Sequence, residues 1–297
     1  MLPTPDLWPL ARTGHRWLAR AKRRETLVDG HRMVWLERGS PGQDRPTVVL
    51  LHGFAAMKEN WGLWLPRLPM DWHLLVPDLP GLGESDYRAD ASYRFEAQAL
   101  RLREWLDGLG LTAVHLVGSS MGGAIATVLA HRMEPQARSL ILLNSAGIPE
   151  HAGVDIDAPF TSDRDAILIP GDFKSVYRMF NSVGNGKPNP MGVAMTGLLA
   201  PDLLRRTESL RHIFADMVAD ALAPARYLGQ SRIPLQVQWG DRDVITPTRC
   251  VDYFRTHTPH ADIRVFRGVG HLPMIEAPGA SARALTGFIR QLAYVSC

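Results

Sequence analysis

The sequence predicts an α/β fold in which a mostly parallel central sheet is flanked by helices and carries an inserted helical cap. Short apolar runs that stop at Gly or Pro alternate with segments of helical periodicity, a pattern typical of parallel sheets covered on both faces. The length of 297 residues suffices for one large core. Between residues 148 and 229 only helical pieces remain, and this segment is the predicted cap.

Residues 1–24 are expected to form a basic amphipathic segment ahead of the core. The segment is rich in Arg and Lys, and its apolar residues from Leu7 to Ala21 recur at helical spacing on one face. Because it has no uninterrupted apolar run, we expect neither a signal peptide nor a membrane span. Two interpretations stay open: the apolar face packs on the protein itself, or residues 7–24 make peripheral contact with an anionic membrane surface.

The α/β core is expected to occupy residues 25–147 and 230–297. It starts with a hairpin between the runs ETLVDG and HRMVWLERG, because Asp29-Gly30 is a strong turn signal. Apolar residues at helical spacing predict helices near 95–109, 121–133 and 285–292. The further predicted strands are Thr47–Gly53, His73–Gly81, Val114–Gly118, Ser139–Gly147, Ile233–Gly240 and Ala261–Gly268.

Composition narrows the class of partner and the compartment. The formal net charge of only +3 gives no reason to expect a nucleic-acid partner. Cys250 and Cys297 make neither a disulfide framework nor a metal-ligand spacing, so we interpret both as thiols in a reducing, cytoplasmic compartment. The glycines lack the G-x-G-x-x-G spacing of a dinucleotide site. No metal is expected, and the oligomeric state is not predicted.

Two adjacent serines stand where the strand Val114–Gly118 meets a helix. Ser120 has Gly118 two residues before it and Gly122 two residues after it, which is the G-x-S-x-G frame of a nucleophile at a sharp strand-to-helix turn. Small residues are needed at those positions because strand and helix approach closely there. Ser119 lacks the frame and is interpreted as a filler of the turn. Ser120 is therefore the candidate nucleophile.

A serine nucleophile needs a base and an acid that orients the base. On this architecture both should follow later strands, with the acid first. The segment VQWGDRDVITP offers Asp241 and Asp243 after one strand, and VFRGVGHLPM offers His271 after the next. His271 is the candidate base, and either aspartate is a candidate acid.

An acyl-transfer site also needs two N–H donors for the oxyanion. The backbone N–H of Met121 opens the helix after Ser120 and gains from the positive end of the helix dipole. The backbone N–H of Phe54 follows the apolar strand that ends in His52 and Gly53. These two groups are the predicted oxyanion hole, whereas His52 is expected to fix its loop by hydrogen bonding.

Five segments together resemble the α/β-hydrolase superfamily: LLHGFAAMKENW, VPDLPGLGESD, HLVGSSMGGAIA, QWGDRDVITP and GVGHLPMIEAP. The first and third resemble bacterial family V lipases/esterases and monoacylglycerol-lipase-like hydrolases, which tend to show H-G-F-x-x-x-K-x-x-W and S-M-G-G. The resemblance implies a triad of Ser120, Asp243 and His271, with the acid three residues after Gly240. It also implies an inserted helical cap and no cofactor. Some relatives carry a membrane-spanning N-terminal helix, a pattern from which this sequence departs.

The expected function is therefore a serine carboxylic-ester hydrolase, an esterase or lipase, that cleaves esters of short- to medium-chain acids through an acyl-enzyme. Its partner would be a small-molecule ester or lipid, with monoacylglycerol as one candidate. Two alternatives stay open. Carbon–carbon bond hydrolases of ring-cleavage products share the S-M-G-G elbow but usually carry G-P-G after H-G, which HGFAAM lacks. A non-catalytic ligand-binding module of this fold would usually have lost a triad member.

The cap supplies the candidate substrate contacts. It is rich in methionine and phenylalanine, which suit an adaptable apolar acyl pocket. The same side chains would serve equally well as the core of the cap. The candidates are Met179, Phe180, Met191 and Met195.

Overall fold

The computed structural model describes residues 8–43, 45–150, 168–184 and 190–295. Eight strands form one sheet in the order β1-β2-β4-β3-β5-β6-β7-β8; β2 runs antiparallel to its neighbours β1 and β4, and all the other neighbouring strands pair in parallel. The predicted α/β fold is confirmed. The strands are β1 (Lys22–Val28), β2 (His31–Arg38), β3 (Thr47–Leu51), β4 (His73–Pro77), β5 (Val114–Ser119), β6 (Ala137–Leu143), β7 (Leu235–Gly240) and β8 (Asp262–Phe266).

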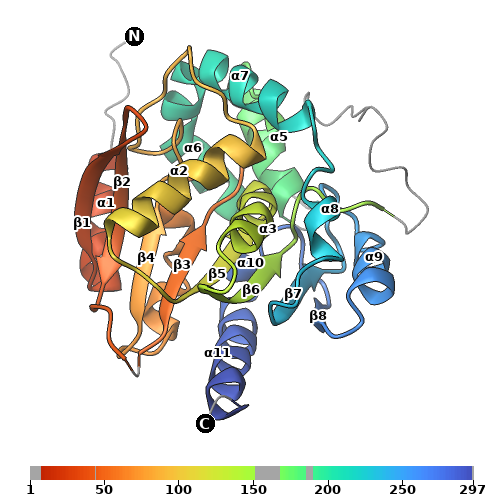
Figure 1. The fold of residues 1–297 in the computed structure, drawn as a ribbon. Coiled ribbons are helices and arrows are strands. Elements are labelled where there is room, and N and C mark those ends of the chain that lie inside the picture. The colour runs from red at the N-terminus through yellow and green to blue at the C-terminus, as the bar shows by residue number, and fades with distance from the viewer. Residues whose placement is uncertain (1–7, 44, 151–167, 185–189, 296–297) are drawn as a thin grey trace.

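Helices cover both faces of the sheet and the carboxyl ends of its strands (Figure 1). The helices are α1 (Trp8–Ala19), α2 (Phe95–Gly108), α3 (Met121–Arg132), α5 (Phe173–Val183), α6 (Pro190–Arg205), α7 (Thr207–Val218), α8 (Ala225–Leu228), α9 (Cys250–His257), α10 (Pro273–Glu276) and α11 (Pro278–Val295), with the 3₁₀ helices η1 (Lys58–Trp61) and η2 (Leu65–Arg67). Within the described residues, no helix is both long and apolar enough to cross a bilayer.

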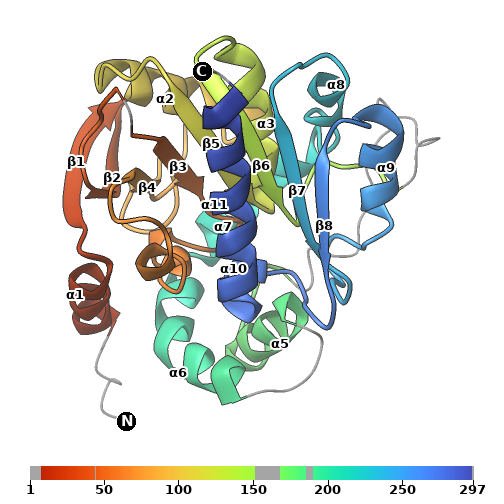
Figure 2. The ribbon, with the colours of Figure 1, turned by 90° about the horizontal axis from the view of Figure 1, so that it is seen from below.

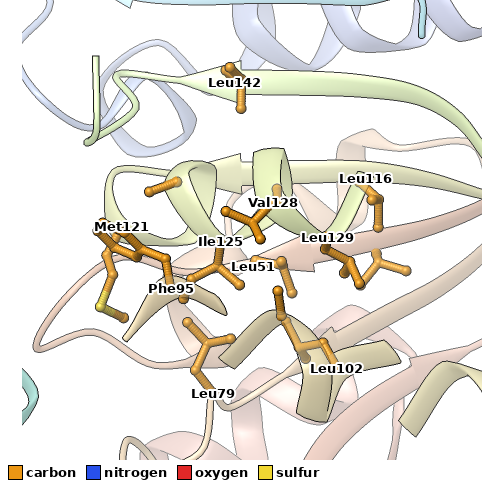
Figure 3. Close-up of a cluster of buried hydrophobic side chains, with 14 of the residues drawn as sticks. Leu51, Leu79, Phe95, Leu102, Leu116, Met121, Ile125, Val128, Leu129 and Leu142 are labelled. Atoms are coloured by element: carbon orange, nitrogen blue, oxygen red, sulfur yellow. The ribbon is translucent and has the colours of Figure 1, made fainter. Parts of the chain in front are cut away.

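Two hydrophobic cores flank the sheet because its central strands are apolar on both faces. In β3, Val49 and Leu51 point into one core, and Val48 and Leu50 into the other. The first core packs the sheet against α2 and α3. Figure 3 shows its centre, where Ile125 and other side chains of α3 lie among residues of the strands and of α2. The second core packs the opposite face against η1, η2, α10 and α11.

The segment between β6 and β7 is helical, and α5, α6 and α7 lie beyond the carboxyl ends of the strands (Figure 1). We refer to α5, α6, α7 and α8 as the cap helices. The residues around 151–167 and 185–189 are outside the described part of the chain. The boundaries of the cap at 148 and 229 therefore stay a prediction.

The N-terminal segment differs from one of its two interpretations. Helix α1 forms as predicted, but its apolar residues Trp17 and Leu18 are 80% and 64% exposed. The side of the helix that packs on the protein carries Arg12 and Arg16, which pair with Glu59 and Glu84, together with the apolar residues Trp8 and Ala19. The prediction that the apolar face packs on the protein was therefore wrong for Trp17 and Leu18, because ion pairs to distant carboxylates decide which side of the helix faces inward.

Candidate active site

Ser120 lies at the turn between β5 and α3 with φ of 52° and ψ of −121°. A non-glycine residue in this left-handed region costs about 1–3 kcal/mol, so the surrounding packing must impose it. A Cβ atom on Gly118 would overlap the carbonyl oxygen of Gly122, and one on Gly122 would overlap those of Leu51 and His52. The glycines of the G-x-S-x-G frame are therefore required by close backbone packing.

The two serines of the turn have different surroundings. Ser119 is completely buried, and its Oγ has no hydrogen-bond partner among the described residues. Ser120 is partly exposed and lines a pocket. Of the two hydroxyls, that of Ser120 is the one that can reach a bound molecule.

The structure brings Asp243 and His271 together. They follow the neighbouring parallel strands β7 and β8, whose carboxyl ends share one edge of the sheet. The Nδ1 atom of His271 lies 2.7 Å from Oδ2 of Asp243, and both side chains are almost fully buried. With Nδ1 as the donor, Nε2 stays available as an acceptor. His271 lines the same pocket as Ser120.

The carboxylate of Asp243 is held by several further donors. Its Oδ1 accepts hydrogen bonds from the backbone N–H groups of Ile245 (2.7 Å) and Thr246 (3.0 Å), and its Oδ2 accepts one from the Thr246 hydroxyl (2.6 Å). The side-chain amide of Asn144 also donates to Oδ2. Burial raises the pKa of Asp243, but the charge of His271 and the hydrogen bonds outweigh it, so its pKa is lowered overall. The carboxylate is thus fixed in its ionised form.

Asp241, the other candidate acid, is engaged elsewhere. Its Oδ1 accepts a 2.7 Å hydrogen bond from the backbone N–H of Gly268, in the turn that follows β8. Gly268 has φ of 73°, so the carboxylate closes a turn that favours glycine. This contact gives Asp241 a structural role and leaves Asp243 as the acid that contacts His271.

The loop that carries His271 is tied down on both sides. The carboxylate of Glu276 accepts hydrogen bonds from the N–H groups of Gly270 (2.9 Å) and Leu272 (3.1 Å), the residues before and after the histidine. Burial raises the pKa of Glu276. The N–H of His271 itself donates to the carbonyl oxygen of Val183, the last residue of α5, at 3.1 Å.

The predicted oxyanion donors lie beside Ser120. Gly53 packs directly against it, since a Cβ atom on Gly53 would lie 3.1 Å from Cβ of Ser120. Phe54 is the next residue and lines the pocket. Met121 is the first residue of α3, so its N–H has no partner within that helix. Both N–H groups therefore belong to segments that contact the serine, and their role as an oxyanion hole stays a prediction.

His52 fixes the loop that contains Phe54. Its Nδ1 donates to the carbonyl oxygen of Gly53 (2.8 Å), and its Nε2 accepts from the N–H of Leu79 (3.0 Å). Burial lowers the pKa of His52, which favours the neutral ring that this pattern needs. With both nitrogens engaged, His52 positions its loop.

A buried charged cluster lies next to this loop. The fully buried Nζ of Lys58 lies 2.6 Å from a carboxylate oxygen of Asp78, 2.6 Å from one of Glu84 and 3.2 Å from one of Glu59. Asp78 also accepts hydrogen bonds from the backbone N–H groups of Lys58 and Glu84, both at 2.7 Å. The lysine of the H-G-F-x-x-x-K-x-x-W segment thus joins two loops from inside the protein.

Ser120 and His271 open into an apolar pocket of about 390 Å³. Its walls come from α7, with Phe214 and Met217, and from the loops that follow β3 and β6. The ring of Phe54 meets that of Phe214 edge to face at 5.4 Å between centroids. The volume lies at the small end of the range for ligand pockets. An apolar group of modest size next to the serine fits this space.

Three of the four substrate contacts predicted in the cap are not among the described residues that line this pocket. Met179 is buried in the core, and Phe180 and Met195 pack against it. The side chain of Met191 lies outside the described residues. Met217, from the same segment, does line the pocket. A substrate role for Met179, Phe180, Met191 and Met195 stays a prediction, and α7 supplies the cap side chains nearest the serine.

The comparisons with known proteins agree with this geometry. Residues 46–181 match the model of the alpha/beta hydrolase fold family. Lipase 1 of Psychrobacter immobilis is 33% identical over 255 residues, which cover 85% of this chain and 78% of the relative. The chain belongs to the α/β-hydrolase family.

Two further relatives of this α/β hydrolase act on lipids according to their names. Monoacylglycerol lipase abhd6-B of Xenopus laevis is 26% identical over 279 residues, or 88% of this chain and 80% of the relative. Among solved structures, a bacterial membrane phospholipase A is 26% identical, with a TM-score of 0.85 over 97% of this chain and 91% of its own.

Three supporting residues of this α/β hydrolase escaped the sequence analysis: Asn144, Thr246 and Glu276. Each lies within a few residues of a predicted element or site residue, but nothing in one sequence shows which polar side chain turns toward the acid or the base. Among the residues that the structure describes, no group of three or more His, Cys, Asp or Glu side chains could hold a metal ion.

Proposed function

We propose that this α/β hydrolase is a serine carboxylic-ester hydrolase of the esterase/lipase class that acts on esters of short- to medium-chain acids. One observation carries the proposal: Ser120 and His271 line the same apolar pocket, and His271 is hydrogen-bonded to the buried carboxylate of Asp243. The named lipases among its relatives support the same activity. A small or medium acyl chain suits the pocket volume of about 390 Å³.

The reaction proceeds in two steps of acyl transfer. Nε2 of His271 takes the proton of Ser120 as Oγ attacks the ester carbonyl, and the N–H groups of Phe54 and Met121 bind the oxyanion. The alcohol leaves with the proton from His271, and Ser120 keeps the acyl group. His271 then activates a water, which releases the acid and restores the serine. Asp243 holds the ring with Nδ1 as donor and stabilises the imidazolium that forms.

The substrate proposed is an ester or lipid, with a monoacylglycerol as one candidate. For such a water-insoluble ester, the enzyme meets its substrate at a lipid surface. The proposal therefore includes peripheral membrane contact through residues 7–24, of which the structure describes 8–24. It also includes a cytoplasmic location.

The test uses p-nitrophenyl esters of increasing chain length and the pair of variants Ser120→Ala and Ser119→Ala. Replacement of Ser120 should lower kcat by about 10⁶, as in serine-protease triads. Ser119→Ala is the matched control, because the Ser119 hydroxyl is buried outside the pocket, and it should retain the activity of the wild type. The absence of ester turnover in pure, folded protein would contradict the proposal. Turnover that survives Ser120→Ala would contradict the choice of nucleophile.

A second substrate, a product of aromatic ring cleavage, tests for carbon–carbon bond hydrolysis in place of ester hydrolysis. The enzyme should leave it intact at concentrations at which p-nitrophenyl esters are cleaved. Faster turnover of the ring-cleavage product than of every ester would favour the alternative function.

A further inference from the structure

Helix α1 turns an aromatic and an aliphatic side chain to the solvent. Trp17 is 80% exposed and Leu18 is 64% exposed, although both are large and apolar. They are consecutive residues in the last turn of the helix. Single exposed apolar residues need no explanation, but an exposed Trp-Leu pair on one helix marks a surface that another phase or molecule can cover.

The orientation of α1 is fixed by ion pairs on its other side. Arg16 lies 2.9 Å from Glu84, and Arg12 lies 3.8 Å from Glu59, whose side chain is only 4% exposed. Both carboxylates also contact the buried Lys58. Rotation of α1 to bury its apolar pair would separate these charges and leave the carboxylates without two of their cations, which is costly for buried groups. The outward position of Trp17 and Leu18 is therefore a stable feature of the fold.

Of the cations near this apolar pair, two have no acidic partner among the described residues. Arg23 pairs with Glu25 and Glu84, and Arg24 pairs with Glu37. Arg20 and Lys22 are exposed and form no ion pair within the described part of the chain. Both line a depression of about 550 Å³, together with Arg16, Trp17, Leu18 and Ala21.

We propose that this surface, formed by Trp17, Leu18, Arg20 and Lys22, docks the enzyme on a bilayer that contains anionic phospholipid. Tryptophan favours the boundary between headgroups and acyl chains, and leucine reaches the acyl chains. The cations add attraction to anionic headgroups, worth about fivefold in affinity per charge near the surface. This charge complementarity favours an anionic bilayer over a second copy of the chain, whose own cations would face these.

Docking by α1 presents the cap to the same surface. Figure 2 shows α1, α5 and α6 along one edge of the molecule. These cap helices also carry exposed apolar residues, Phe173 on α5 and Val193 on α6. A lipid ester that leaves the bilayer would therefore meet the cap first. The inference rests on the proposed ester hydrolysis for its purpose, but lipid binding can be measured without turnover.

The test is sedimentation of the full chain with two kinds of vesicle, one of phosphatidylcholine alone and one of phosphatidylcholine with about 30% phosphatidylglycerol. The variants are Trp17→Glu with Leu18→Glu, and Arg20→Glu with Lys22→Glu. Leu100→Glu is the control, because Leu100 is another exposed leucine (51%) on α2, a helix that lies on the opposite side of the molecule from α1 in Figure 2. Hydrolysis of a water-soluble p-nitrophenyl ester reports on each variant separately.

The wild type and Leu100→Glu should bind the anionic vesicles at least about tenfold more tightly than either double variant, and less tightly in high salt. All four proteins should cleave the soluble ester equally. Equal sedimentation of the wild type and both double variants would overturn the proposal, as would a dimer in solution that Trp17→Glu with Leu18→Glu dissolves while vesicles stay unbound. If the wild type binds the anionic vesicles but cleaves no ester, the proposed function is contradicted and the proposed docking surface is still supported.

Discussion

The backbone N–H of His271 donates a hydrogen bond to the carbonyl oxygen of Val183, 3.1 Å away. Val183 ends α5, so the loop of the candidate base is joined directly to a cap helix. The contact is made between backbone atoms, and no side chain has to be of a given type for it to form. This hydrogen bond links the cap to the loop of the candidate base, so a change in the position of α5 should change the position of His271.

Loss of the N-terminal cap of α5 should lower both stability and turnover. Asp172 and Ser175 form a capping box, in which the Asp172 side chain accepts a 2.7 Å bond from the Ser175 N–H. Asp172→Ala should cost about 1 kcal/mol of unfolding free energy. Because α5 also holds His271, kcat should fall severalfold. Asp220→Ala is the control, since it removes a partly exposed ion pair with Arg226 on the cap and should leave kcat unchanged. Equal kcat values for Asp172→Ala and the wild type would separate α5 from the base.

Glu276 should act as a positioning residue for His271. Glu276→Ala would leave the N–H groups of Gly270 and Leu272 without an acceptor, at about 1–3 kcal/mol for each group that stays buried. The loop should loosen, so kcat should fall while KM changes little. Glu276→Gln keeps one acceptor oxygen and should restore part of kcat. Steady-state kinetics and urea unfolding curves of both variants check this prediction. A fall in the free energy of unfolding with unchanged kcat would mean a purely structural role.

Asp243 and its donors should contribute unequally to turnover. Asp243→Asn should lower kcat by about 10⁴, because it removes the charge that orients the histidine tautomer. Thr246→Val removes the hydroxyl that donates to Asp243 and should lower kcat by a smaller factor. Asp241→Asn is the matched control: it retains an acceptor for Gly268 and should behave as the wild type. A larger loss for Asp241→Asn than for Asp243→Asn would reverse the assignment of the acid.

The charged cluster around Lys58 should make stability fall in acid. Partial burial alone would raise the pKa of Glu84, but Lys58, Arg12 and Arg16 outweigh it and lower the pKa from 4.5 to about 2. A lowered carboxyl pKa contributes stability that is complete above pH 4.5 and is lost as the pH falls toward 2. Urea unfolding at pH 7, about 4.5 and about 3 should show this loss.

Two variants separate Glu84 from its neighbours. Glu84→Gln should be less stable than the wild type at pH 7 and should lose less stability between pH 4.5 and 2. Lys58→Met leaves buried carboxylates without their cation and should cost about 3–5 kcal/mol at pH 7. An acid slope that is identical in Glu84→Gln and the wild type would contradict the role of Glu84.

The centre of the sheet was predictable from sequence because strands such as β3, β4 and β7 are buried on both faces and stop at or near Gly or Pro. The run predicted at 114–118 is β5 with one residue added, and the hairpin turn at Asp29-Gly30 joins β1 and β2 as expected. The predicted strand at 139–147 was too long at its carboxyl end. Asn144 there has φ of 43°, which ends the extended strand, and its side-chain amide donates a hydrogen bond to Asp243.

The side of α1 that faces the protein and the residues that line the pocket were not predictable from the sequence alone. The periodicity of α1 finds its apolar side, but its direction depends on Glu59 and Glu84, which lie far along the chain. Likewise, Met179 and Met217 look alike in sequence and both are buried in the core, yet only Met217 lines the pocket. Composition identifies candidate lining residues, and tertiary packing selects among them.

The absence of a side chain at Gly122 lets the start of α3 pack directly against the end of β3 in the candidate active site. With its backbone seated against the carbonyl oxygens of Leu51 and His52, the start of α3 and the end of β3 meet without room for a methyl group. A saturation library at this position should yield glycine alone among active clones. Variants with new substrate preferences should therefore be sought among substitutions in α7, whereas the junction at Gly122 must stay unchanged.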